Sequence, residues 1–145
     1  MENVNKIKII LPSLSENESF ARSVVSCFVL RLNPSVAEIN DIKTAVSEAV
    51  TNSIVHGYPN MIGEIVLELE IIDDLVHINV FDCGVGIENL SEALEPFYTT
   101  KEDEERSGMG FTIMKSFMDE VNVISSYGEG TKVYMSKKIN SNAKV

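Results

Sequence analysis

Several residue types are scarce in this 145-residue chain, and each shortage excludes a class of protein. Two cysteines and two histidines are too few for a disulfide framework or a zinc cluster. Eight glycines and four prolines exclude a collagen-like or low-complexity chain. No apolar run approaches the length of a membrane span, and Met1 to Lys8 lack the apolar core of a signal peptide. We therefore expect a cytosolic protein without a membrane segment.

Positive charge is also scarce. Twelve basic residues against 22 acidic residues give a net charge of -10, so diffuse binding to nucleic acid or an anionic membrane is not expected. An anionic ligand would need a local site. Hydrophobic residues, by contrast, are plentiful at 44 %, as in a folded globular domain. This length supports one domain over residues 1–145.

The spacing of apolar residues predicts seven elements in the order strand, helix, helix, hairpin, loop, helix, hairpin. The predicted segments are Lys6–Leu11, a helix from Ser15 to Leu32, a helix from Ser35 to His56, the strands Glu64–Ile71 and Val76–Val80, the loop Cys83–Gly110, the helix Phe111–Met118, and the strands Val121–Tyr127 and Thr131–Met135. This order lacks the alternation of a doubly wound sheet. It predicts an α+β fold, a two-layer sandwich with helices on one face of a mixed, mostly antiparallel sheet.

Each of the first two predicted helices begins with the residue spacing of a capping box. The pairs are Ser15 with Glu18 and Ser35 with Glu38. In the first helix, apolar residues recur every three or four positions from Phe20 onward, which predicts a packed face that includes Phe20. The long loop after the first hairpin is typical of an active-site lid.

The first candidate site residue is Asp82, which breaks the pattern of its strand. The apolar residues of positions 76–80 alternate, so parity places the carboxylate of Asp82 on the same, core-directed face. The alternative is a strand that ends early, with Asp82 in solvent. Asp82 begins the stretch D-C-G-V-G, in which Gly84 and Gly86 let the backbone approach a flat ligand. The carboxylate would then accept a donor such as the amine of adenine.

A second candidate pair is Glu48 with Asn52, four residues apart in E-A-V-T-N and therefore on one helix face. The alternative is an ordinary solvated face. The neighbouring Ala45 and Ala49 are small and leave room beside the pair. An Asn oxygen suits Mg²⁺ and a Glu suits a base, and phosphoryl transfer needs both a metal and an oriented nucleophile.

A third candidate is the stretch S-G-M-G-F, which places Gly108 and Gly110 at the start of the last helix. Free amides and the helix dipole there favour a phosphate, although an ordinary loop is equally compatible with the pattern. Lys101 and Arg106 flank this loop and either bind phosphates or pair with the acidic residues around them. Neither a P-loop nor a common protein-kinase signature is present in the sequence.

Four short motifs thus occur in a fixed order over about 85 residues: E-x-x-x-N, D-x-G-x-G, G-x-G and G-E-G-T. This order resembles the Bergerat ATP-binding fold of the GHKL superfamily, shared by type II topoisomerases, mismatch-repair ATPases and histidine kinases. The stretches N-E-S-F-A-R, V-S-E-A-V-T-N, H-G-Y and E-R-S-G-M-G-F-T-I-M further resemble the sporulation anti-sigma factors that are also serine protein kinases. This resemblance spans nearly the whole chain.

The resemblance implies a role for each candidate residue. At the reactive end of the nucleotide, Asn52 would hold Mg²⁺ and Glu48 would act as the catalytic base. At the other end, Asp82 would accept from the adenine amine, and the adenine pocket would include Gly84, Gly86 and Thr131. The phosphates would be bound by Lys101, Arg106, Gly108 and Gly110, and Arg22 would contact a protein partner. The loop from Phe97 to Gly110 carries cations for the phosphates and glycines that can change backbone angle, so we also predict that nucleotide state selects the partner through this loop.

The function implied by the resemblance is that of a homodimeric, ATP-dependent serine kinase that sequesters an RNA polymerase sigma factor. Its substrate would be a serine of a small anti-anti-sigma protein. One alternative is a nucleotide-gated binding module without phosphotransfer, which would need no base at Glu48. A second alternative is the catalytic fragment of a histidine kinase. It is disfavoured because His56 is predicted at a helix end and His77 in a strand, so neither lies in the helix pair that carries an acceptor histidine.

Overall fold

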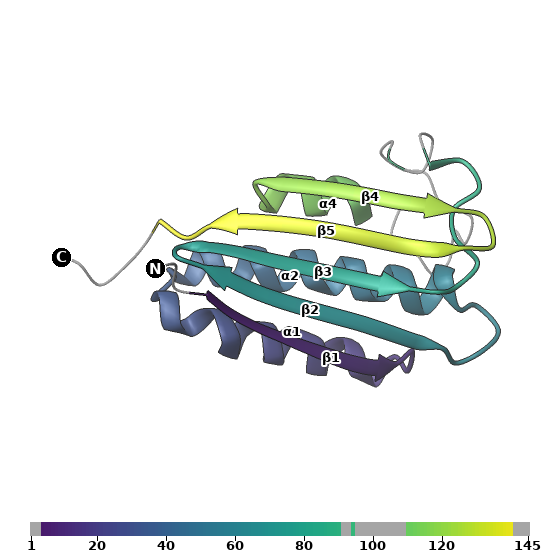
Figure 1. Cartoon of the computed structure of the whole chain (residues 1–145), viewed down its shortest axis with the longest axis horizontal. Helices are drawn as coiled ribbons and strands as arrows, with labels where there is room; N and C mark the ends of the chain where they lie inside the picture. The colour runs from purple at the N-terminus through teal and green to yellow at the C-terminus, as the bar shows by residue number, and fades with distance from the viewer. Residues whose placement is uncertain (1–3, 91–93, 95–109, 141–145) are drawn as a thin grey trace.

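The computed structural model describes residues 4–90, 94 and 110–140. Within them, five strands form one sheet in the order β1-β2-β3-β5-β4, and every pairing is antiparallel. The elements are β1 (Val4–Pro12), α1 (Glu16–Val29), η1 (Leu30–Leu32), α2 (Val36–Asn52), η2 (Ser53–Gly57), β2 (Glu64–Ile72), β3 (Leu75–Asp82), α4 (Gly110–Phe117), β4 (Glu120–Ser126) and β5 (Gly130–Lys138). Figure 1 shows α1, α2 and α4 on the same face of the sheet. The predicted α+β sandwich is confirmed.

The sheet buries one face and exposes the other because its strands alternate. In β2, Ile65, Leu67 and Leu69 are completely buried toward the helices, whereas Glu68 and Glu70 point away from them. The same alternation in β3 buries every second residue up to the strand's end. The core therefore lies between the sheet and the helices.

The helices complete this core with stripes of small and branched side chains. α1 buries Ala21, Val25 and Val29, spaced four residues apart, and α2 lies between α1 and α4. Among the described residues, no helix is long and apolar enough to cross a membrane.

Two details of the first helix differ from the prediction. Ser15 lies in the helical region at φ -57°, so its side chain makes no capping bond, and Glu18 instead forms an ion pair with Arg22 at 2.5 Å. An N-cap serine needs an extended conformation for its oxygen to reach the third amide. Phe20 is 52 % exposed rather than packed, because the stripe that faces the sheet begins one residue later, at Ala21.

The second helix begins and ends near the predicted positions. The amide of Glu38 donates to the hydroxyl of Ser35 at 3.0 Å, and the Ser35 amide donates to the Glu38 carboxylate at 2.9 Å, so this capping box is confirmed. The helical segment continues to Gly57, but its last turn, η2, is π-helical. Such turns occur frequently at functional sites.

Strand register brings distant parts of the chain to one end of the sheet. β1 and β3 run in the same direction because both pair antiparallel with β2. Pro12 lies opposite Glu64, and Asp82 lies opposite the next residue, Ile65, so both strands end together. Thr131, near the start of β5, lies opposite Asp82. The site described below lies at this end.

Candidate functional site

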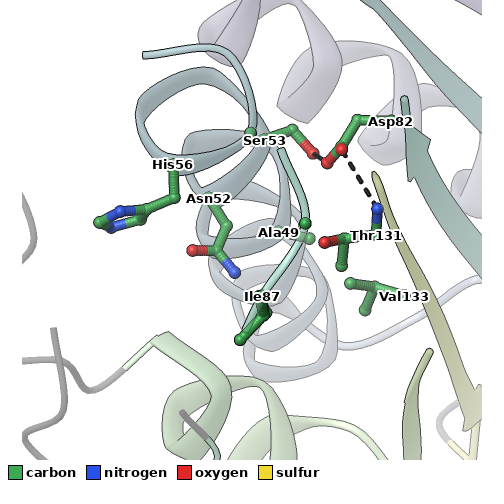
Figure 2. A pocket seen from close by; sticks show the side chains of 10 residues that line it. Ala49, Asn52, Ser53, His56, Asp82, Ile87, Thr131 and Val133 are labelled. Atoms are coloured by element: carbon green, nitrogen blue, oxygen red, sulfur yellow. Dashed lines mark hydrogen bonds between the residues drawn. The ribbon is translucent and has the colours of Figure 1, made fainter. Parts of the chain in front are cut away.

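A pocket of about 290 Å³, including the part open to solvent, lies between η2 and the ends of β3 and β5. It is lined by Ala49, Asn52, Ser53, His56, Gly57, Asp82, Gly86, Ile87, Thr131 and Val133. Figure 2 shows Asn52, Ser53 and His56 on the helical side and Asp82 and Thr131 on the strand side. An apolar wall with a few convergent polar groups is typical of a small-molecule site.

Asp82 is held in this pocket by three hydrogen bonds. Its carboxylate is only 6 % exposed and turns toward the helices, as strand parity predicts. One oxygen, Oδ2, accepts from the hydroxyl of Ser53 at 2.7 Å. The other, Oδ1, accepts from the amides of Gly84 at 2.9 Å and Thr131 at 3.2 Å. Three donors thus compensate its burial, and a solvated turn residue is excluded.

Ser53 is a site residue that the sequence pattern does not reveal. Its side chain is 4 % exposed and holds the Asp82 carboxylate in place. The available signal is that Ser53 directly follows Asn52, but a lone serine inside a helix is more often a neutral surface residue. Asn52 at the end of α2 and Ser53 and His56 in the π-helical turn that follows line the same pocket.

Gly84 and Gly86 have different structural reasons for lacking a side chain. Gly86 has φ +75°, and a Cβ atom on it would lie 2.0 Å from the carbonyl oxygen of Ser126. Gly86 lines the pocket, as predicted. A Cβ atom on Gly84 would lie 2.1 Å from the carbonyl oxygen of Gly57, so Gly84 permits close packing of the loop on η2. Gly84 therefore supports the pocket from outside its lining.

Of the predicted pair on α2, Asn52 lies at the pocket and Glu48 is buried outside its lining. Asn52 lines the pocket, whereas Glu48 lies one turn earlier on α2, is 8 % exposed and is not among the lining residues. A glutamate buried to this extent is uncommon. Its burial excludes an ordinary solvated helix face at this position. His56, four residues after Asn52, also lines the pocket, although its sequence pattern indicates only a helix end.

Two further predicted residues, Gly110 and Arg22, lie within the described part of the chain but are not lining residues of this pocket. Gly110 is the first residue of α4, which packs against α2. Arg22 lies on α1, where its guanidinium pairs with Glu18 and its side chain is 38 % exposed. Lys101, Arg106 and Gly108 lie outside the described residues.

Comparison with known proteins assigns the chain to a family. The sequence profile of the histidine kinase-like ATPase domain matches residues 11–137. The anti-sigma F factor of Clostridium beijerinckii is 56 % identical over 137 residues, which cover 94 % of this chain and 96 % of that protein. The chain belongs to the anti-sigma F factors of the histidine kinase-like ATPase family. The anti-sigma F factor of a Thermoanaerobacter species is 52 % identical over 97 % of this chain and 99 % of that protein.

Solved structures show the fold of this family in more distant proteins. The RsbU and RsbW domains of Mycobacterium tuberculosis Rv1364c match with a TM-score of 0.68 at 19 % identity, over 96 % of this chain and 33 % of that one. The catalytic domain of the histidine kinase ThkA, in a nucleotide-free form, matches with a TM-score of 0.58 at 16 % identity, over 93 % of this chain and 96 % of that one. These likenesses concern the fold alone.

Membership in this ATPase family implies that the protein binds ATP and supports an ATP-using, kinase-type activity. The geometry fits the base of such a nucleotide. Acceptor oxygens of Asp82 and Thr131 lie beside apolar wall residues such as Ile87 and Val133. A flat, amine-bearing base needs this combination of apolar contact and acceptors.

Tyr58 fixes the backbone that follows Asp82. It is 7 % exposed, and its hydroxyl donates to the carbonyl of Glu64 at 2.7 Å while it accepts from the amide of Cys83 at 2.7 Å. Gly63 allows the ring this position, since a Cβ atom there would lie 2.2 Å from the ring. Burial raises the pKa of the Tyr58 phenol above 10.0, with smaller contributions from the Cys83 amide, which lowers it, and Asp82, which raises it.

We expect Tyr58→Phe to lower the free energy of unfolding by about 0.5–1.5 kcal/mol at neutral pH, because the part-buried hydrogen bond from the Cys83 amide loses its acceptor. The raised pKa means that this contribution is complete below pH 10.0 and is lost as pH rises through the folded-state pKa. Urea denaturation at neutral and alkaline pH should therefore show the gap between wild type and variant closing above pH 10.0. A pH-independent gap would contradict this role. Tyr134→Phe, on the opposite face of the sheet, is the matched control.

Proposed function

We propose that this protein is an ATP-dependent serine kinase and anti-sigma factor. It binds an RNA polymerase sigma factor, of the sigma F class by analogy with its relatives, and phosphorylates a serine of the anti-anti-sigma protein that opposes it. The observation that carries the proposal is the buried Asp82 carboxylate, held by three donors in a pocket that Asn52 also lines. Glu48 lies one helical turn before Asn52 on α2. A homodimer in the cytoplasm belongs to the same proposal.

In this proposal, the adenine lies against the strand side of the pocket. Oδ2 of Asp82 accepts one hydrogen bond from Ser53, and its second lone pair accepts a hydrogen bond from the exocyclic amine. Thr131 supplies a second oxygen, and Gly86 lines the base pocket with its backbone packed closely against Ser126. Gly84 keeps the loop in position behind the base.

The reactive end of the nucleotide lies toward α2. Among the described residues, no group of three or more His, Cys, Asp or Glu side chains is placed to hold a metal ion. Mg²⁺ commonly binds through one or two protein ligands together with substrate phosphates, which is compatible with Asn52 alone at this site. Bound Mg-ATP would supply the phosphoryl group. Glu48 would accept the proton of the serine hydroxyl as the serine oxygen bonds to the γ-phosphorus, while the bond from that phosphorus to the β,γ-bridging oxygen breaks and ADP leaves.

The phosphate contacts proposed for Lys101, Arg106, Gly108 and Gly110 complete this arrangement, with Gly110 at the start of α4. The proposed switch, in which ATP favours the sigma factor and ADP favours the anti-anti-sigma protein, concerns the loop from Phe97 to Gly110. Apart from Gly110, that loop lies outside the described residues.

The proposed partner surface lies on α1, near the same end of the sheet as the pocket. α1 begins four residues after β1 ends, and β1 ends level with β3. Its second turn presents Arg22, paired with Glu18, close in sequence to the 52 %-exposed ring of Phe20. Exposed aromatic and arginine side chains are the residue types most enriched in interface hot spots.

We expect Arg22→Ala to weaken binding of both protein partners by at least tenfold, a loss of about 1.4 kcal/mol, while ATP affinity stays unchanged. Arg22 contributes to α1 through a partly exposed i, i+4 pair, whose loss costs only about 0.3–0.5 kcal/mol of stability. Surface plasmon resonance with each partner measures the effect. Arg31→Ala, on the exposed end of the same helical segment, is the matched control. Unchanged binding of both partners would remove Arg22 from the interface.

The binding function is tested by co-purification of the protein with sigma F in the presence of Mg-ATP and without nucleotide. The proposal predicts a complex that is stabilised by ATP and released when the anti-anti-sigma protein is added. A nucleotide-gated module without phosphotransfer would form the same complex and leave the anti-anti-sigma serine unmodified. Failure of any sigma factor to bind, in either nucleotide state, would contradict the anti-sigma function.

A further inference from the structure

Ser125 lies behind the nucleotide pocket, near the end of β4 and opposite Thr131 on β5. Its hydroxyl oxygen accepts from the amide of Ile87 at 2.8 Å and donates to the carbonyl of Gly130 at 3.0 Å. The same oxygen lies 2.7 Å from the hydroxyl oxygen of Thr131. Ser125 is not a lining residue, but two of its partners, Ile87 and Thr131, are.

The direction of the bond between the two hydroxyls follows from a count of protons. A serine hydroxyl has one hydrogen and two lone pairs. In Ser125, the hydrogen is directed to Gly130 and the Ile87 amide occupies one lone pair. Only the second lone pair remains for Thr131. The arrangement that satisfies every group therefore makes the Thr131 hydroxyl the donor and Ser125 the acceptor.

This direction determines what Thr131 offers a ligand. With its proton committed to Ser125, the Thr131 hydroxyl presents lone pairs alone to the pocket. Thr131 is 8 % exposed, and its amide already donates to Asp82, so neither its backbone nor its side chain has a hydrogen left for the base. Figure 2 shows Thr131 beside Asp82 on the strand side. These two residues then form a wall of acceptors.

We propose that Ser125 is a positioning residue that makes the pocket selective for a purine with an amino group at carbon 6. An amino group donates to both acceptors, whereas a 6-oxo group would face oxygen lone pairs without a hydrogen between them. Ser125 acts through Thr131 and never touches the nucleotide. The inference rests on the proposed ATP site and adds to it the origin of base selectivity.

The test compares the affinities of the full-length protein for Mg-ATP and for Mg-ITP, which carries an oxo group at carbon 6. In Ser125→Ala, the Thr131 hydroxyl is free to rotate and donate to the oxo group. We expect the ATP-to-ITP affinity ratio to fall about tenfold, the effect of roughly one hydrogen bond. Ser126→Ala is the matched control on the same strand, since its side chain points to the opposite face.

Two further variants separate selectivity from general damage. Ser125→Thr keeps the hydroxyl in a strand position that favours threonine, so it should retain the wild-type ratio. Thr131→Val removes the oriented hydroxyl and should lower the ratio by itself. Adding Ser125→Ala to Thr131→Val should then leave the ratio where Thr131→Val put it, because the effect passes through Thr131.

Calorimetry of these variants gives a decision in either case. A ratio that falls in Ser125→Ala, returns in Ser125→Thr and does not fall further in the double variant supports the proposal. Equal losses of ATP and ITP affinity in Ser125→Ala would overturn it, since Ser125 would then only support the loop through Ile87. If Ser125→Ala does not fold, Ser125→Cys, a weaker hydrogen-bonding isostere, replaces it under the same criteria. A wild-type protein that binds neither nucleotide would refute the ATP site itself.

Discussion

Asp82→Asn is expected to lower the affinity for Mg-ATP by about 100-fold or more, the equivalent of one charge-assisted hydrogen bond of up to 3 kcal/mol. The amide nitrogen has no favourable position at this site. Placed at Oδ1, it faces the amides of Gly84 and Thr131, which are donors like itself. Placed at Oδ2, it faces the proposed adenine amine, which is a donor, while the Ser53 hydroxyl can rotate to accept from it. Each placement opposes donor to donor.

The same contacts show that Asp82 also stabilises the fold, because it joins η2, the loop after β3 and the start of β5. We therefore expect the variant to unfold more easily by about 1–3 kcal/mol. Calorimetry at a temperature where the variant is folded separates this cost from lost binding. Asp73→Asn is the matched control, because Asp73 has φ +54°, a conformation that asparagine also adopts. ATP affinity within threefold of wild type would remove Asp82 from the adenine site.

Glu48→Gln is expected to slow phosphotransfer by about 100-fold to 10,000-fold, the range for loss of a general base. The glutamine side chain keeps the shape of glutamate at this 8 %-exposed position but does not accept a proton. Binding of Mg-ATP and of sigma F should be retained, because Asn52 and Asp82, rather than Glu48, line the pocket. The effect should appear in the rate of transfer and not in affinity.

Single-turnover transfer to the anti-anti-sigma protein at saturating Mg-ATP measures this rate directly. Glu70→Gln is the matched control, because Glu70 points away from the helices on the outer face of β2. Transfer near the wild-type rate in Glu48→Gln would contradict the role of Glu48 as base. It would leave the nucleotide-gated module as the better description of the site.

The parts of the fold and site that follow local periodicity could be predicted from the sequence. Strand alternation correctly placed the carboxylate of Asp82 on the core side, and Asn52, selected by its i, i+4 spacing from Glu48, lines the pocket. Gly86 could be recognised from the stretch D-C-G-V-G. The structure gives the reason for glycine at this position, because φ is positive and a backbone neighbour lies close. In each case, the signal is carried by a few consecutive residues.

The parts that depend on tertiary structure could not be predicted. Ser53 and Ser125 are single serines without a surrounding pattern, and only the packing of η2 and β4 gives them buried partners. Phe20 has the spacing of a packed residue, but the rotation of α1 on the sheet, set by Ala21 and its neighbours, leaves the ring exposed. Such rotations are determined by side-chain volumes across the whole core, which no local window contains.

We propose that this pocket transfers the terminal phosphate of ATP to a protein serine. To test this, the wild-type protein is incubated with γ-labelled ATP, Mg²⁺ and the anti-anti-sigma protein, and the labelled residue is identified by mass spectrometry. We expect label on one serine of the anti-anti-sigma protein, dependent on Mg²⁺ and absent with Asp82→Asn. ATP binding without label on that protein, or label on a histidine, would contradict it.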